Sequence, residues 1–153
     1  MKIFVITICN KNENYEKLLT EKYNKLIRKF YDLSFININF KKDKKNKNIY
    51  KEEYQKAISL IKPNSIVVAL DELGKACKSV EFSKKMNFWL ENSSNIYFFV
   101  GGPDGLSEEV LNKADYVFSL SNLTFPHLLA KIILIEQIYR SICIMNNHPY
   151  HRS

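Results

Sequence analysis

The last eight residues, NNHPYHRS, gather the side chains best suited to acid–base chemistry: His148, Tyr150, His151 and Arg152. Imidazole and phenol groups can move protons, and a guanidinium group binds phosphate firmly. Together these side chains suit contact with RNA phosphates and bases, although terminal segments of this length also often fray. A zinc site would need further ligands, and no cysteine or carboxylate pair has suitable spacing. We therefore expect no bound metal.

A second candidate is GGPDGL, residues 101–106, which holds three of the four glycines in the chain. Glycine allows the backbone to approach a neighbouring group closely, because no Cβ intervenes. The segment does not match G-x-G-x-x-G, and the chain contains no G-x-x-x-x-G-K-[ST], so a dinucleotide site or a P-loop is poorly supported. The spacing alone leaves two alternatives open, a tight turn beside a ligand and a tight turn without one.

The elements around these residues alternate along the chain. Short apolar runs predict strands at 2–9, 34–40, 65–70, 95–100 and 115–119, and helical patterns occupy 14–32, 50–62, 80–92, 108–114 and 128–145. The run SIVVAL at 65–70 lacks polar alternation, which is typical of a strand buried on both faces of a parallel sheet. We predict an α/β fold with a mostly parallel sheet flanked by helices. No repeat or boundary appears, so residues 1–153 are expected to form one domain.

The helices are amphipathic to different degrees. The first predicted helix keeps its apolar residues at helical spacing, with lysine and glutamate between them: Tyr15, Leu19, Tyr23, Leu26 and Phe30. We expect Ser107 to cap the short helix and Thr124 to cap the last one. That last helix is apolar around most of its circumference. It therefore has more apolar surface than packing against one face of a sheet would bury. The excess predicts a homodimer that forms through the C-terminal helix.

The net charge of the chain is +7, which attracts polyanions such as nucleic acid. Lysine far outnumbers arginine, and asparagine and isoleucine are abundant, so a compositional bias explains the charge about as well. Segment 41–51, KKDKKNKNIYK, carries six lysines and one aspartate. It is expected to form a solvated surface loop, with RNA contact as a second role.

Cysteine usage and the N-terminus point to the cytoplasm. Cys9, Cys77 and Cys143 are scattered, which argues against a disulfide framework and for a reducing compartment. No apolar run reaches the roughly 18 residues that span a bilayer. The N-terminus MKIFVITICN lacks a basic region followed by a small-residue cleavage site.

Three loops follow the predicted central strands: LDELGK at 70–75, GGPDGL at 101–106 and LSNLTFPH at 120–127. In open parallel sheets, ligands bind beyond the carboxyl ends of the strands. We expect the three loops to converge on one pocket.

These loops, with SLSNLTFPHLLAKIILIEQIYR and NHPYHR, resemble in order and spacing the RlmH-type methyltransferases of the SPOUT (α/β-knot) superfamily. The resemblance covers nearly the whole chain and is strongest from Ile66 to Arg152, whereas Asn10 and Asn12 depart from the small residues common in the family. It implies a C-terminal trefoil knot and a homodimer. It also implies methyl transfer from S-adenosylmethionine to N3 of a pseudouridine in large-subunit ribosomal RNA.

The resemblance also assigns residues. The cofactor pocket would consist of Leu70, Gly101, Leu120, Ser121, Asn122, Leu123, Thr124 and Phe125. The acceptor side would be the tail, with His148, Tyr150, His151 and Arg152 in catalytic roles and with His151 or Tyr150 as the proton acceptor. His127 would orient the cofactor loop or serve only the structure. Glu136 and Arg140 have the i, i+4 spacing of a helix ion pair.

Two other functions would each explain part of the sequence. A noncatalytic RNA-binding module with the same core would explain the charge and the tail. A nucleotide-binding enzyme of another class would use GGPDGL to hold phosphate. Neither rival predicts all the matched segments together.

Overall fold

The centre of the molecule is a parallel sheet. The computed structural model describes residues 1–9, 13–39, 48–102 and 104–152, and in these the sheet has five strands in the order β2-β1-β4-β3-β5. The strands are β1 (Lys2–Ile8), β2 (Asp32–Ile38), β3 (Ser65–Ala76), β4 (Asn95–Val100) and β5 (Tyr116–Ser119). Every neighbouring pair is parallel, which confirms the predicted sheet type.

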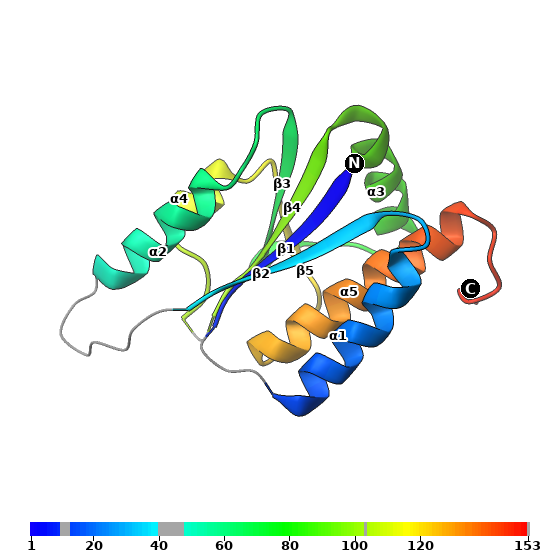
Figure 1. Ribbon diagram of the computed structural model, residues 1–153, viewed down its shortest axis with the longest axis horizontal. Helices are drawn as coiled ribbons and strands as arrows, with labels where there is room; N and C mark the ends of the chain where they lie inside the picture. The colour runs from blue at the N-terminus through cyan, green and yellow to red at the C-terminus, as the bar shows by residue number, and fades with distance from the viewer. Residues whose placement is uncertain (10–12, 40–47, 103, 153) are drawn as a thin grey trace.

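Helices cover both faces of the sheet (Figure 1). On one face lie α1 (Asn14–Ile27), α3 (Ser79–Asn92) and α5 (His127–Met145), with α5 in contact with both of the others. On the opposite face lie α2 (Asn48–Ser59) and α4 (Glu108–Lys113). The predicted order of strands and helices is confirmed throughout.

The sheet separates two apolar cores. Successive side chains of its central strands point alternately into one core and the other. In β3, Val68 packs toward α3 and α5, whereas Val67 packs toward α2 and α4. The same alternation in β4 sends Phe98 to the first core and Phe99 to the second. This burial on both faces is why SIVVAL and NIYFFV contain no polar alternation.

Segment 71–76 differs from the expectation of a loop, because it continues β3. After an irregularity between Leu70 and Lys75, it pairs with β5 so that Lys75 lies opposite Phe118. A Cβ added at Gly74 would lie 2.5 Å from the carbonyl carbon of Phe118. The prediction failed because DELGKA is polar and contains glycine, whereas strand signals rest on apolar alternation.

The bounds of several helices and strands differ from the predicted ones. Helix α1 ends at Ile27 rather than at residue 32, and β2 begins at Asp32. Ser107 caps α4 as predicted, since its Oγ accepts a hydrogen bond from the Val110 N–H at 3.4 Å. The predicted Thr124 cap of α5 is wrong, because Pro126 occupies the N-cap position and no side chain caps the helix. Asn10, Asn12 and most of the lysine-rich segment 41–51 lie outside the described residues.

The inner face of α1 is more polar than its sequence suggests. Tyr15 and Phe30, assigned to the apolar face, are 45% and 48% exposed, whereas Glu16 and Thr20 are buried. The reason is an ion pair to α5: Lys131 Nζ lies 2.6 Å from Glu16 Oε1, and both side chains are at most 5% exposed. Asn37 Oδ1 of β2 also accepts a hydrogen bond from Lys131 Nζ at 3.3 Å. One buried ammonium group thus joins α1, α5 and β2.

The apolar surface of α5 is used mainly inside the chain. Its buried residues include Leu134, Ile135, Ile138 and Ile142, which face the sheet and the flanking helices α1 and α3. Leu129 remains 41% exposed. No helix within residues 1–9, 13–39, 48–102 and 104–152 has the length and hydrophobicity to cross a membrane.

The ion pair of Lys131 predicts a stability effect. Lys131→Met would leave the Glu16 carboxylate buried without its cation, so we expect the free energy of unfolding to fall by about 3–5 kcal/mol. Urea denaturation measures the loss. The double variant Lys131→Met/Glu16→Leu should recover most of it, and Lys17→Met on the exposed side of α1 serves as control. Equal stability of Lys131→Met and the control would contradict this account.

Candidate active site

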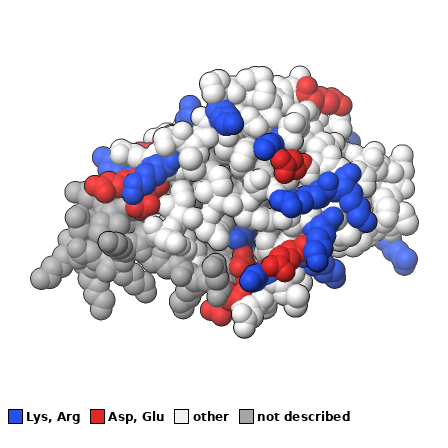
Figure 2. All heavy atoms as spheres, viewed as in Figure 1, with Lys and Arg blue, Asp and Glu red and all other residues white. Residues whose placement is uncertain are grey.

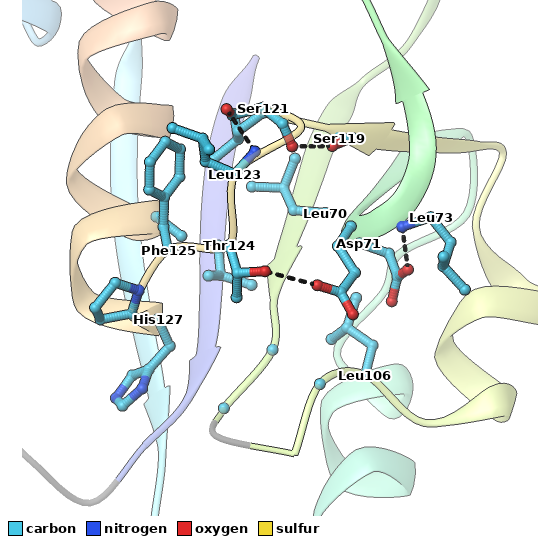
Figure 3. A pocket seen from close by; sticks show the side chains of 18 of the residues that line it. Leu70, Asp71, Leu73, Leu106, Ser119, Ser121, Leu123, Thr124, Phe125 and His127 are labelled. Atoms are coloured by element: carbon cyan, nitrogen blue, oxygen red, sulfur yellow. Dashed lines mark hydrogen bonds between the residues drawn. The ribbon is translucent and has the colours of Figure 1, made fainter.

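The three predicted loops do converge on one cavity, of about 960 Å³, at the carboxyl ends of the central strands (Figure 3). Its walls come from the ends of β3 and β4, from the segment after β5 and from the first turn of α5. The lining residues are Leu70, Asp71, Glu72, Leu73, Val100, Gly101, Gly102, Asp104, Gly105, Leu106, Ser119, Leu120, Ser121, Leu123, Thr124, Phe125, Pro126, His127 and Ala130.

The glycine cluster forms a tight turn in the cavity wall. Gly102 pairs with Gly105, whose N–H donates to the Gly102 carbonyl at 3.0 Å and whose φ is +77°. A Cβ at Gly101 would lie 2.7 Å from the Gly105 carbonyl carbon, and one at Gly102 would lie 2.5 Å from the Ile8 carbonyl oxygen. The turn itself therefore requires glycine, and its bare backbone then faces the cavity.

The segment after β5 is held by its own hydroxyl groups. Ser119 Oγ donates to the Ser121 carbonyl at 2.8 Å, and Ser121 Oγ accepts from the Leu123 N–H at 3.0 Å. Thr124 Oγ1 then donates to Glu72 Oε2 at 3.2 Å, across to the extension of β3 (Figure 3). This bond ties two walls of the cavity together, and it occupies the hydroxyl that was expected to cap α5.

Seven of the eight predicted cofactor residues line the cavity: Leu70, Gly101, Leu120, Ser121, Leu123, Thr124 and Phe125. Asn122 is exposed and is not among the lining residues. Sequence reasoning did not single out Asp71, Glu72 and Asp104, which add three carboxylates to the wall. All three lie within the loops that the sequence had singled out, so their position in those loops was the available signal.

His127 joins the cavity wall to the end of β1. Its Nε2 lies 2.8 Å from the Sγ of Cys9, a residue that is 7% exposed. Cys9 N–H in turn donates to the Ile38 carbonyl at 3.2 Å. Of the two roles left open for His127, this contact favours the structural one, because it holds the first turn of α5 against the end of β1.

The C-terminal tail is turned back onto the helices by a Schellman motif. Asn147 adopts a positive φ of 53°, its N–H donates to the Ile144 carbonyl at 3.2 Å, and the His148 N–H donates to the Cys143 carbonyl at 2.8 Å. Asparagine tolerates this left-handed conformation better than most residues. The tail therefore leaves the helix in a defined direction.

Tyr150 and His151 contact a charged pair on α5. The Glu136 Oε1 atom accepts from Arg140 Nη2 at 2.6 Å and from the Tyr150 hydroxyl at 3.1 Å, which confirms the predicted ion pair. The Tyr150 ring packs 4.9 Å from the guanidinium of Arg140. Arg140 Nη1 lies 3.2 Å from His151 Nδ1. Because guanidinium can only donate, His151 Nδ1 accepts and the ring proton of the neutral imidazole sits on Nε2.

These contacts determine what the tail can do in this arrangement. Burial, followed by the hydrogen bond with Tyr23 and the charge of Glu136, raises the pKa of Tyr150 well above its usual 10. Its phenol is therefore a hydrogen-bond donor near neutral pH and a poor base. His148 is exposed and accepts from the Tyr150 N–H at 3.2 Å, and Arg152 is exposed.

The structure brings seven of the eight predicted cofactor residues together, but it does not bring the tail to them. The cavity lies at the first turn of α5, whereas the tail contacts Glu136 and Arg140 (Figure 1). Pro126 and Arg140 are 14 residues apart, which is about 20 Å along a helix axis. Within one chain, the two groups of predicted site residues occupy opposite ends of α5.

Comparison with known proteins identifies the family of this chain. The model of the predicted SPOUT methyltransferases matches residues 1–151. The chain belongs to the SPOUT methyltransferase family. It is 40% identical to the ribosomal RNA large subunit methyltransferase H of Clostridium kluyveri and to that of Clostridium botulinum, over 99% of this chain and all of each relative. The protein of the same name from Clostridium tetani is 36% identical over the same shares.

The family match includes every part of the candidate site except Arg152. Residues 1–151 cover the three loops of the cavity and the tail as far as His151, so the SPOUT methyltransferase model spans both ends of α5. Among the described residues of this SPOUT methyltransferase, no group of three or more histidine, cysteine, aspartate or glutamate side chains is arranged to hold a metal ion.

The raised pKa of Tyr150 can be tested by spectroscopy. In an alkaline titration followed by tyrosinate absorbance, the difference between the wild-type protein and Tyr150→Phe should titrate above the pKa of about 10 of a free tyrosine. The folded pKa is raised, so the contribution of Tyr150 to stability is complete below pH 10 and declines as the pH rises further. A difference that titrates at or below the pKa of N-acetyltyrosinamide would overturn the assignment.

Proposed function

We propose that this protein methylates large-subunit ribosomal RNA in the cytoplasm, with S-adenosylmethionine as donor and N3 of a pseudouridine as acceptor. The observation that carries the proposal is full-length identity of 36–40% to ribosomal RNA large subunit methyltransferase H proteins. The converging loops and the tail, with its proton-handling side chains, support the same conclusion. The assignment of pseudouridine as the methyl acceptor follows from the family resemblance.

The cavity is suited to an adenosyl donor. Its volume of about 960 Å³ lies at the upper end of small-molecule sites. Leu70, Leu120 and Phe125 offer apolar surface for a flat base, and the bare backbone at Gly101 and Gly102 offers hydrogen-bonding groups for the base edge. The donor supplies a methyl group on a positively charged sulfur, and the carboxylates in the wall favour that charge. These residues bind and orient the donor.

The reaction places different demands on the tail. A nitrogen attacks the methyl carbon in line, the bond from that carbon to sulfur breaks, and the N3 proton must be accepted. Alignment can supply much of the rate. Tyr150, with its raised pKa, donates a hydrogen bond. His151 is the better proton acceptor, through the Nδ1 lone pair that Arg140 occupies in this arrangement. Arg152 is available to hold phosphate.

We propose a homodimer in which each cavity is completed by the tail of the partner. The support is the distance along α5 between the cavity and the tail of one chain. Leu123 and Leu129, at the cavity and on the adjoining turn of α5, are 71% and 41% exposed, and Leu18 on the neighbouring α1 is 68% exposed. These side chains offer apolar surface for a subunit contact.

We also propose that residues 1–153 form one domain with the C-terminal trefoil knot of the family. One sheet with helices on both faces supports the single domain. The segment between β5 and α5 lies among the other two cavity loops, and α5 then lies between α1 and α3. This course of the chain is compatible with a threaded C-terminus.

The first test is donor binding. Isothermal titration should detect S-adenosylmethionine binding that S-adenosylhomocysteine competes away and that ATP and NAD do not. Ala130→Phe, which adds bulk to the cavity wall, should weaken binding at least tenfold, or by about 1.4 kcal/mol. Ala114→Phe, outside the cavity, is the matched control. Absence of binding by the wild-type protein would refute the proposal, and competition by ATP or NAD alone would favour the nucleotide-enzyme rival.

The second test separates the tail from the cavity. Truncation after Met145 should abolish methylation of ribosomes while donor binding persists, because the proton-handling groups are removed. Mixing the truncated protein with Ala130→Phe should restore about a quarter of wild-type activity, because half of randomly mixed dimers are mixed and each of these has one intact site.

The controls for this second test concern subunit exchange and substrate. Mass spectrometry should show that the two variants form mixed dimers. Ribosomes that lack pseudouridine should not be methylated. Mixed dimers without activity would refute tail sharing, methylation without pseudouridine would refute the acceptor assignment, and donor binding without any turnover would favour the noncatalytic rival.

A further inference from the structure

Four cations lie at the C-terminal end of α1, beside the tail. Lys22 and Lys25 belong to the last turns of the helix, and Arg28 and Lys29 directly follow its end at Ile27. Lys22, Lys25 and Lys29 are spaced three and four residues apart, as neighbours on one side of a helical turn are. All four are exposed. Figure 2 shows lysine and arginine side chains gathered over this end of α1. We call these four residues the α1 cation row.

The described side chains of the cation row form no ion pairs. Within the described parts of the chain, none of its four residues lies within 4.0 Å of an aspartate or glutamate oxygen in an ion pair. By contrast, Lys56, Lys131 and Arg140 each have a carboxylate partner at 2.8 Å or less. Four unpaired cations in two turns repel one another, and a polyanion relieves that repulsion.

The row adjoins the candidate acceptor site. Tyr23, next to Lys22 in the sequence, places its hydroxyl 3.5 Å from the Tyr150 hydroxyl. The end of α1 and the tail lie side by side in Figure 1.

We propose that the α1 cation row binds the phosphate backbone of the RNA substrate next to the modified base. The inference rests on the proposed function, since it takes the substrate to be ribosomal RNA. The tail contacts the base, and the row holds the phosphates of the neighbouring nucleotides. Such contacts fix the register of the strand without reading its sequence.

The test removes two charges from the row. Binding of a large-subunit ribosomal RNA fragment is measured between 50 and 300 mM salt for Lys25→Gln/Lys29→Gln. The slope of log K against log salt should become shallower by about 1.4 to 1.8, or 0.7 to 0.9 for each lysine. In ribosome methylation, KM should rise about tenfold at low salt, whereas kcat and the affinity for S-adenosylmethionine should not change, because the row touches neither the donor nor the reacting atoms.

Two controls make the result specific. Lys62→Gln/Lys113→Gln removes the same charge from exposed positions following α2 and at the end of α4, and should leave the slope nearly unchanged. Lys25→Arg/Lys29→Arg should retain wild-type binding. An equal change in both glutamine variants, or an unchanged slope in the first, would overturn the proposal. The proposed function fails separately, through absent donor binding or absent turnover by the wild-type protein.

Discussion

The contact between Gly74 and the backbone of Phe118 is the constraint on which the cavity depends. Without a side chain at residue 74, the extension of β3 can lie against β5 and pair with it. That pairing carries Glu72 to the hydroxyl of Thr124, which fixes the segment after β5. The fixed segment then faces the glycine turn, where close contacts at Gly101 and Gly102 exclude side chains. Two regions of bare backbone thus position a site whose other walls combine apolar side chains with carboxylates and hydroxyl groups.

Helix α5 connects the two halves of the proposed chemistry. Its first turn belongs to the cavity and is joined to β1 through His127 and Cys9. One turn further on, the buried Lys131 joins it to α1 and β2. Its far half holds the tail through Glu136 and Arg140. A rigid helix fixed at several points keeps these ends apart, so a second chain is the most direct means of bringing tail and cavity together.

The sequence predicted what depends on periodicity and could not predict what depends on distant polar partners. Buried strands such as 65–70 and 95–100 were found because apolar side chains serve both cores. The polar extension of β3 was missed because its pairing depends on Gly74 and β5. The inner face of α1 was misjudged because Glu16 is buried only with Lys131, 115 residues away. The positions of the loops after the central strands located the cavity, and the resemblance assigned residues within it. The contacts of Tyr150 and His151 with Glu136 and Arg140 could be seen only in the structure.

The charges at the two ends of α5 bear on how two chains would meet. Asp71, Glu72 and Asp104 give the cavity wall an acidic character that suits a sulfonium donor and repels RNA phosphate. The α1 cation row and Arg152 give the tail end the opposite sign. An antiparallel pairing of two α5 helices brings the acidic end of each chain to the basic end of the other, and two-fold symmetry repeats that attraction. In the proposed pairing, the cations would hold the phosphates while the base entered the cavity.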